Sequence, residues 1–167
     1  DGKASKDFGR IISDRHFERI SKMITGDVVV GGETDAATKY ISPTVIDNVI
    51  SNHPAMQEEI FGPIMPVIGF DSIDEVIGTI SDGEKPLALY IFSKSNKTKK
   101  RFINETSSGV ILFNDLIVHA GHAALPFGGI GNSGIGAYNG KIGFETFSHK
   151  KPIMYRSTLG DVPQKYP

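Results

Sequence analysis

An alternation of apolar runs and amphipathic segments between residues 64 and 114 constrains the fold more than any other feature of the sequence. The apolar runs IMPVIGF, LALYIFS and GVILFN predict strands, and SIDEVIGTISDG and NKTKKRFINETS between them predict helices. The first run lacks polar alternation, so we expect a strand that is buried on both faces. Strands that alternate with helices through short connections form crossover units. The order predicts an α/β fold with a mainly parallel sheet covered by helices on both faces.

The residues before this alternation predict a helix and short strands. In segment 13–24, Phe17, Ile20 and Ile24 recur at helical spacing, Ser13 is a possible cap, and Gly26 ends the pattern. The runs DVVVGG and YISPTVI predict two short extended segments.

Length, charge and cysteine content exclude several classes of protein. The chain has 167 residues, which predicts one domain, and a formal net charge of -1, so we expect no nucleic-acid partner. It has no cysteine, which excludes disulfides, thiolate metal sites and a cysteine nucleophile within the chain. The first residues lack a signal pattern and no apolar run approaches the ~20 residues of a membrane helix, so we expect a cytoplasmic protein.

A glycine-rich segment, GGIGNSGIG, contains the spacing G-x-G-x-x-G at Gly129, Gly131 and Gly134. A dinucleotide-binding fingerprint needs a preceding strand, a following helix and an acidic residue about 20 positions later. The segment HAALPF precedes these glycines and two lysines lie at the later position. We therefore interpret the segment as a loop that needs close backbone packing or positive φ angles.

Polar residues after the run GVILF are candidates for a site. Asn114 and Asp115 follow a strand whose carboxyl end could face a ligand, but Asn114 could equally satisfy turn backbone groups, and we favour the turn. His119 and His122 are three residues apart, and only Asp115 is near enough in sequence to complete a metal site. We predict no metal and interpret these histidines as structural or pocket-lining.

Glu58 and Glu59 stand directly before an aromatic residue and a Gly-Pro pair. Adjacent side chains point to different sides, so at most one of these carboxylates can face a buried site. If the backbone is extended, Phe61 lies on the same side as Glu59. A carboxylate can accept hydrogen bonds from sugar hydroxyls while a nearby ring packs on a flat heterocycle.

Four motifs in a fixed order resemble the aldehyde dehydrogenase superfamily: EEIFGPIMPV, GEKPLALYIFS, ETSSGVILFND and LPFGGIGNSGIGAYNGKIGFETFSHKKP. The last motif is most similar to the class 3 and fatty aldehyde dehydrogenase branch. The resemblance covers residues from about 7 to 167. It implies a catalytic domain of an enzyme that oxidises medium- or long-chain or aromatic aldehydes to carboxylic acids with NAD or NADP.

The resemblance also implies roles for individual residues. Glu59 matches the glutamate that holds the nicotinamide-ribose hydroxyls, and Phe61 matches the aromatic residue beside the nicotinamide. Phe127 matches a phenylalanine of the aldehyde pocket, and Asn114 matches a position that supports the active-site loops. We expect Asn114 and His119 at the same substrate pocket. The nucleophilic cysteine and general-base glutamate of the family precede EEIFGP and have no counterpart here. We therefore expect no catalytic residue in the chain and no turnover from it alone.

By resemblance, residues 1–148 are the C-terminal portion of the catalytic domain, and residues 149–167 are an oligomerisation strand and tail. The segment PIMYR, residues 152–156, is the predicted strand and is expected to join a homo-oligomer, a dimer. The chain would then be a fragment or a natural truncation. The alternative is a truncated, non-catalytic scaffold or assembly module with the same fold. Without the hydrophobic tail of some fatty aldehyde dehydrogenases, the sequence leaves membrane anchoring undecided.

Overall fold

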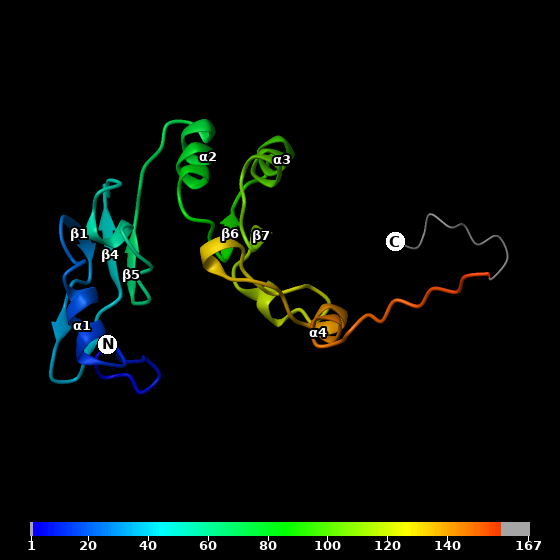
Figure 1. The fold of residues 1–167 in the computed structure, drawn as a ribbon. Coiled ribbons are helices and arrows are strands. Elements are labelled where there is room, and N and C mark those ends of the chain that lie inside the picture. Colours follow the sequence, from blue (N-terminus) through cyan, green and yellow to red (C-terminus); the bar gives the residue numbers. More distant parts are fainter. Residues whose placement is uncertain (1, 158–167) are drawn as a thin grey trace, which may run out of the picture. The chain divides into compact units, whose positions relative to one another are not determined.

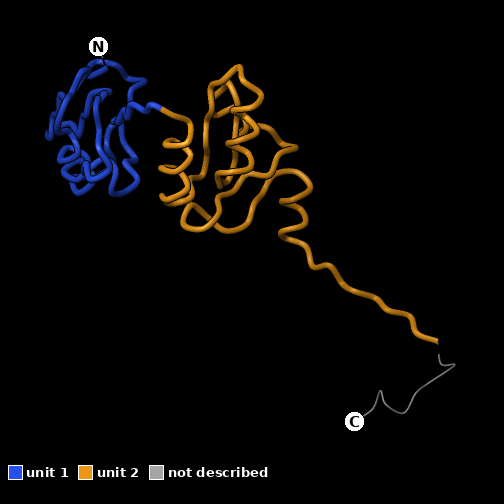
Figure 2. The backbone as a smooth tube through the Cα atoms, turned by 90° about the horizontal axis from the view of Figure 1, so that it is seen from above, with its two compact units in different colours: residues 1–71 blue, residues 72–167 orange. Residues whose placement is uncertain are grey.

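The computed structural model describes residues 2–157 and divides them between two units, which are described separately below. Figure 2 colours the first unit, up to Asp71, blue and the second unit, from Ser72, orange. The family-based boundary at residue 148 is of another kind and stays a prediction. In the described part of the chain, no helix has the length and apolar character needed to cross a membrane.

The first unit is built on helix α1, Asp14–Ser21, which confirms the helix predicted from sequence. The Ser13 hydroxyl caps it by accepting a hydrogen bond from the amide of His16. Its apolar face buries Phe17 and Ile20 in the core of the unit. The core cluster comprises Phe17, Ile20, Met23, Ile41, Ile46, Val49, Ala55 and Ile64.

Two small sheets complete this unit. A three-stranded sheet has the order β1-β4-β5, with β1 (Asp27–Val30) antiparallel to β4 (Thr44–Asp47) and β4 parallel to β5 (Ile64–Pro66). Strands β2 (Thr34–Asp35) and β3 (Tyr40–Ile41) form a separate antiparallel pair. A 3-10 turn, η1 (Pro54–Met56), lies between β4 and β5 along the chain.

The prediction that the run IMPVIGF is a strand buried on both faces is wrong for the described residues. The strand β5 is only Ile64–Pro66, and of its residues only Ile64 is buried. Met65 is 56% exposed and Phe70, beyond the strand, is 57% exposed. A strand needs cover on both faces to bury every side chain, and here only the side that carries Ile64 packs against the core.

The second unit contains the predicted crossover. Helix α2 (Ile73–Asp82) is capped by Ser72 and ends at Gly83, as expected. Strands β6 (Ala88–Ile91) and β7 (Val110–Phe113) then pair in parallel through helix α3 (Asn96–Glu105) (Figure 1). Arg101 of α3 pairs with Asp74 of α2 at 2.6 Å and so ties the two helices together. The α/β fold class is confirmed, although the parallel pairs β4–β5 and β6–β7 belong to separate sheets rather than to one.

The rest of the second unit is mostly irregular. It contains the 3-10 turns η2 (Val118–Gly121) and η3 (Gly131–Ser133) and the helix α4 (Gly140–Thr146). The strand predicted at residues 152–156 is not formed, because no strand in the described part of the chain pairs with it. Its side chains Ile153, Met154 and Tyr155 are 67%, 87% and 94% exposed.

Candidate functional site

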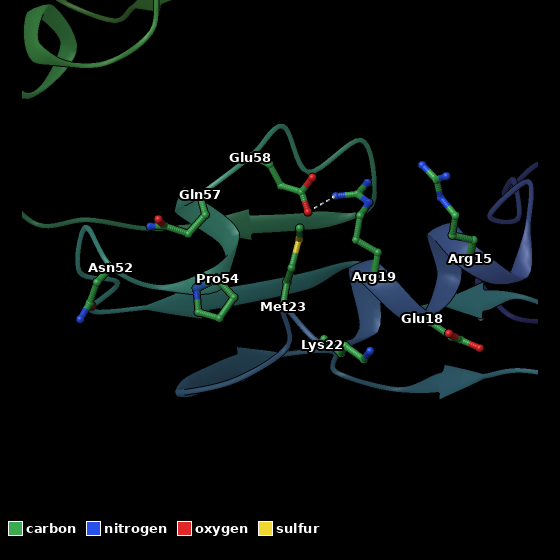
Figure 3. Close-up of a pocket in the computed structure, with 9 residues that line it drawn as sticks. All are labelled: Arg15, Glu18, Arg19, Lys22, Met23, Asn52, Pro54, Gln57 and Glu58. Carbon is green, nitrogen blue, oxygen red and sulfur yellow. Dashed lines mark ion pairs between the residues drawn. The ribbon is translucent and has the colours of Figure 1, made fainter.

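The acidic loop that precedes β5 is attached to helix α1 by Arg19. The guanidinium Nη1 of Arg19 lies 3.2 Å from Oε1 of Glu58 (Figure 3). The same Nη1 donates to the carbonyl of Glu59 at 3.2 Å, and Nη2 donates to the carbonyl of Ile60 at 2.8 Å. Adjacent side chains of a helix point in different directions. Ile20, the next residue of α1, faces the core, and Arg19 beside it can therefore reach the loop.

This attachment makes the two adjacent glutamates different. Glu58 is paired with Arg19, whereas the exposed carboxylate of Glu59 has no hydrogen bond or ion pair within residues 2–157. A free carboxylate accepts hydrogen bonds only, and its two oxygens can bind two hydroxyl donors together. Of the two glutamates, Glu59 is therefore the one available to a ligand.

Phe61 lies beyond this attachment in a left-handed conformation, with a φ of +48°. An aromatic residue rarely adopts this conformation, and such a strained backbone costs about 1–3 kcal/mol. The prediction that Phe61 shares a side with Glu59 depended on an extended backbone, which the structure does not have at Phe61. The ring is instead 82% exposed and borders a cavity of about 360 Å³, which Arg10, Ile11, Ile12 and His16 also line.

The chain after Phe61 is held as firmly as the chain before it. A Cβ placed on Gly62 would lie 2.9 Å from Cδ1 of the core residue Ile20, so the backbone passes close against α1. The carbonyl of Pro63 then accepts a hydrogen bond from the amide of Thr44 at 2.8 Å, which joins the chain to β4. Packing and hydrogen bonds thus fix the entry into β5.

In the second unit, Phe127 belongs to a cluster of rings. Its ring stacks on His119 at 5.9 Å with an interplanar angle of 22° and meets Tyr138 edge to face at 5.6 Å. The backbones of Phe127 and Tyr138 exchange two hydrogen bonds of 3.0 Å. His119 also lies 5.8 Å from the ring of Tyr90 on β6. The ring of Phe127 is therefore held between two neighbours on a fixed backbone.

His119 is 6% exposed, and its Nδ1 is buried without a hydrogen-bond partner in the described chain. The imidazole contributes ring packing at that end rather than a polar contact, in line with a structural or pocket-lining histidine. His122 is exposed, and no group of histidine and acidic residues within residues 2–157 could hold a metal ion.

Asn114 supports the turn after β7. Its Oδ1 accepts a hydrogen bond from the amide of Ser93 at 2.8 Å, and its own amide donates to the carbonyl of Ile91 at 2.9 Å. Both bonds connect the carboxyl ends of β6 and β7, so the favoured interpretation of Asn114 as a turn residue is confirmed. Nearby Ile117 has a φ of +64°, which is an outlier for a β-branched residue, and it is 69% exposed.

The glycine-rich loop is a packing device. A Cβ on Gly129 would lie 2.1 Å from the carbonyl oxygen of Ser133, and Gly134 has a φ of +153°. The short turn η3, rather than an α-helix, follows Gly129. The interpretation of close backbone packing is confirmed. The loop and Phe127 border a cavity of about 430 Å³, which Leu87, Tyr138, Thr146 and Phe147 also line.

The candidate residues thus form two groups, each placed within its own unit. Glu59 and Phe61 lie in the first unit, and Asn114, His119 and Phe127 lie in the second. Sequence reasoning missed Arg19, because its bonds join residues 40 and 41 positions apart, and a surface arginine on a helix carries no sign of such a partner. It also missed the strained Ile117, which no local motif marks.

Comparisons with known proteins decide the family. The sequence model of the aldehyde dehydrogenase family matches residues 1–153. The chain belongs to the aldehyde dehydrogenase family. It is 52% identical over 164 residues to aldehyde dehydrogenase family 3 member A2 of Rattus norvegicus, a match that covers 98% of this chain and 34% of that protein.

Other relatives agree. The chain is 50% identical over 166 residues to the dimeric NADP-preferring aldehyde dehydrogenase of Rattus norvegicus, covering 99% of this chain and 37% of that protein. A solved structure described as the substrate-bound state of Staphylococcus aureus AldH superposes with a TM-score of 0.86 at 40% identity, covering 98% of this chain and 38% of that one. The chain spans about a third of the length of these relatives.

We expect Gly129→Ala to destabilise the second unit by about 1–3 kcal/mol, as overpacking does, because the added methyl group meets the backbone of Ser133. Gly78→Ala is the matched control, since Gly78 lies in helix α2 with nothing near its Cβ position. It should be neutral or stabilise by up to about 1 kcal/mol. Thermal unfolding followed by circular dichroism measures both, and a Gly129→Ala variant as stable as the wild type would refute the packing role.

Proposed function

We propose that this chain is part of an NAD- or NADP-dependent aldehyde dehydrogenase that oxidises medium- or long-chain or aromatic aldehydes to carboxylic acids. Within it, the chain supplies contacts to the nicotinamide ribose and part of the wall of the substrate pocket. The observation that carries the proposal is the free carboxylate of Glu59 close in sequence to the exposed ring of Phe61, while Glu58 is paired.

The residues of this loop suit a nicotinamide nucleotide. Glu59 would accept hydrogen bonds from the two ribose hydroxyls, and a bond to a charged group contributes about 1.5–3 kcal/mol. Phe61 offers an apolar face to the nicotinamide ring. When bound, the nicotinamide accepts a hydride from the substrate. The contribution of this chain is to hold the ribose, and with it the ring, in position.

Phe127 would form a wall of the aldehyde pocket, with its ring fixed by His119 and Tyr138. His119 would act from behind this wall, since it is buried. Asn114 would act indirectly, by joining the turns that follow β6 and β7. An apolar wall favours the apolar part of an aldehyde, which supports medium- or long-chain or aromatic substrates.

The activity is tested on the longest natural protein that contains this chain. With an aldehyde and NAD or NADP, we expect it to form the reduced cofactor, measured by absorbance, and Glu59→Gln to lower the rate of hydride transfer about 10- to 100-fold. Cofactor affinity should fall less, because the rest of the cofactor has other contacts. Glu58→Gln is the matched control and should leave both quantities close to wild type.

Two results would contradict this. Equal losses of rate and affinity for Glu59→Gln, or the same losses for Glu58→Gln, would exclude the ribose role. The chain alone should show no turnover, because it has no cysteine to form a thioester. A natural protein without a nucleophilic cysteine and without activity would favour the non-catalytic scaffold.

Phe127→Ala should change the relative kcat/KM values for aldehydes of different size and leave cofactor affinity unchanged, because the ring would contact the substrate and not the cofactor. Loss of a packed phenylalanine can cost up to about 3–5 kcal/mol of stability, so Phe127→Leu and a thermal unfolding control accompany it. Phe144→Ala removes a ring that is 74% exposed and should not alter selectivity. Unchanged selectivity in both Phe127 variants would exclude a pocket role.

We also propose that residues 152–156 pair with a strand of another part of a homo-oligomer. Support comes from their exposed apolar side chains and from the relative that is named dimeric. The chain should therefore self-associate in sedimentation velocity. Tyr155→Asp should weaken this association, and Lys151→Asp just outside the segment should not. A strictly monomeric wild-type chain would overturn the proposal.

A further inference from the structure

Arg19 has an unusual set of partners for a residue on an exposed helix face. Its guanidinium binds the Glu58 carboxylate and also the backbone carbonyls of Glu59 and Ile60. A guanidinium carries five N–H donors in a planar fork, so it can serve several acceptors at fixed angles. Its side chain is 21% exposed, while that of Glu58 is 54% exposed. The bond to the Ile60 carbonyl is partly buried and is the best shielded of the three.

The two carbonyls belong to the peptide planes on either side of Ile60. The first plane begins at Glu59 and carries its Cα, and the second ends at the Cα of Phe61. The φ angle of Phe61 is the rotation between this second plane and the residue itself, and it takes the strained value of +48°. On the far side, Gly62 is held against Ile20. Neighbouring residues of one helix therefore fix the turn from both sides.

We infer that Arg19 is a positioning residue for the nicotinamide contacts: it acts through the backbone of residues 59–60 to place the Glu59 carboxylate and the Phe61 ring. The inference rests on the function proposed for these two residues. The ion pair with Glu58 contributes less to holding the loop than the two carbonyl bonds do, because a half-exposed ion pair adds little stability. A lysine could not replace Arg19, since a single ammonium group lacks the fork.

A matched control lies one turn earlier on the same helix. Arg15 and Arg19 both line a cavity of about 580 Å³ (Figure 3). The side chain of Arg15 makes no hydrogen bond or ion pair within residues 2–157. Arg15→Gln therefore removes an identical charge from the same surface. Any effect of Arg19→Gln that Arg15→Gln does not reproduce comes from the bonds to the loop.

The kinetic test uses the complete protein with saturating aldehyde and cofactor. We expect Arg19→Gln to slow hydride transfer about 10- to 100-fold, because small displacements of reacting groups are costly, and to raise the deuterium isotope effect on kcat with an aldehyde labelled at the transferred hydrogen. Arg19→Lys should not restore the rate. Arg15→Gln and Glu58→Gln should resemble wild type. Adding Arg19→Gln to Glu59→Gln should cause little further loss, because one acts through the other.

A second test needs no cofactor. In the 167-residue chain, chymotrypsin should cleave after Phe61 several-fold faster in Arg19→Gln than in wild type or Arg15→Gln, at equal thermal stability of the variants. Equal cleavage in all three would overturn the inference, as would Arg19→Gln kinetics equal to those of Arg15→Gln in an active enzyme. If the wild-type protein oxidised no aldehyde, the proposed function would fail instead, and the cleavage rates would still decide whether Arg19 holds the loop.

Discussion

The contact between Ile20 and Gly62 connects the core of the first unit to its candidate site. Ile20 is 1% exposed, so its position is set by the packing of α1 on the sheet. Burial of such a side chain stabilises this packing by about 1.5–3 kcal/mol. Because Gly62 has no side chain, the loop can pack closely against Ile20, and the position of Ile20 therefore fixes that of the loop. Arg19, the next residue of the helix, then binds the loop by hydrogen bonds. One face of helix α1 thus packs in the core, and the adjacent face binds the loop of the candidate site.

The loops, rather than the strands, carry the strained conformations. Phe61 and Ile117 both have positive φ angles, although one is aromatic and the other β-branched. Such conformations persist only where the surrounding structure determines them, and they cluster at functional sites. Both residues are also largely exposed, at 82% and 69%. In both loops, the strained backbone conformation therefore coincides with an apolar side chain that the described residues do not bury.

Local signals in the sequence were sufficient for helices α1, α2 and α3 and for the crossover, whereas helix α4 was not predicted. Ser13 and Ser72 cap their helices as expected, and the order strand, helix, strand predicted the parallel pair β6–β7. The errors concern burial and pairing, which depend on segments distant in sequence. The apolar run of β5 predicts burial on both faces, but the described residues cover only one side. The segment 152–156 has the composition of a strand, but no strand within residues 2–157 pairs with it.

The same limit applied to the site. The motif around Glu59 and Phe61 identified the loop and, by resemblance, Glu59, but the pairing of Glu58 and not of Glu59 depends on Arg19, 40 residues away from Glu59. Likewise, the left-handed turn at Phe61 results from tertiary bonds, because the sequence there has an aromatic residue where a glycine would be expected. Residue types could indicate the chemistry, whereas only the fold could indicate which carboxylate is free.

In both candidate regions, a side chain anchors the backbone of a loop by hydrogen bonds. In each, a polar side chain binds the backbone of a loop: Arg19 binds the carbonyls of Glu59 and Ile60, and Asn114 binds the amide of Ser93. In the first region, Phe61 with its positive φ directly follows the anchored carbonyls, and in the second, Ile117 lies three residues beyond Asn114; both side chains are largely exposed. Side-chain-to-backbone bonds suit this task because they fix the main chain and leave the presented side chain free to meet a ligand. Substitution of an anchoring residue would therefore shift the backbone that carries the exposed side chain without removing that side chain.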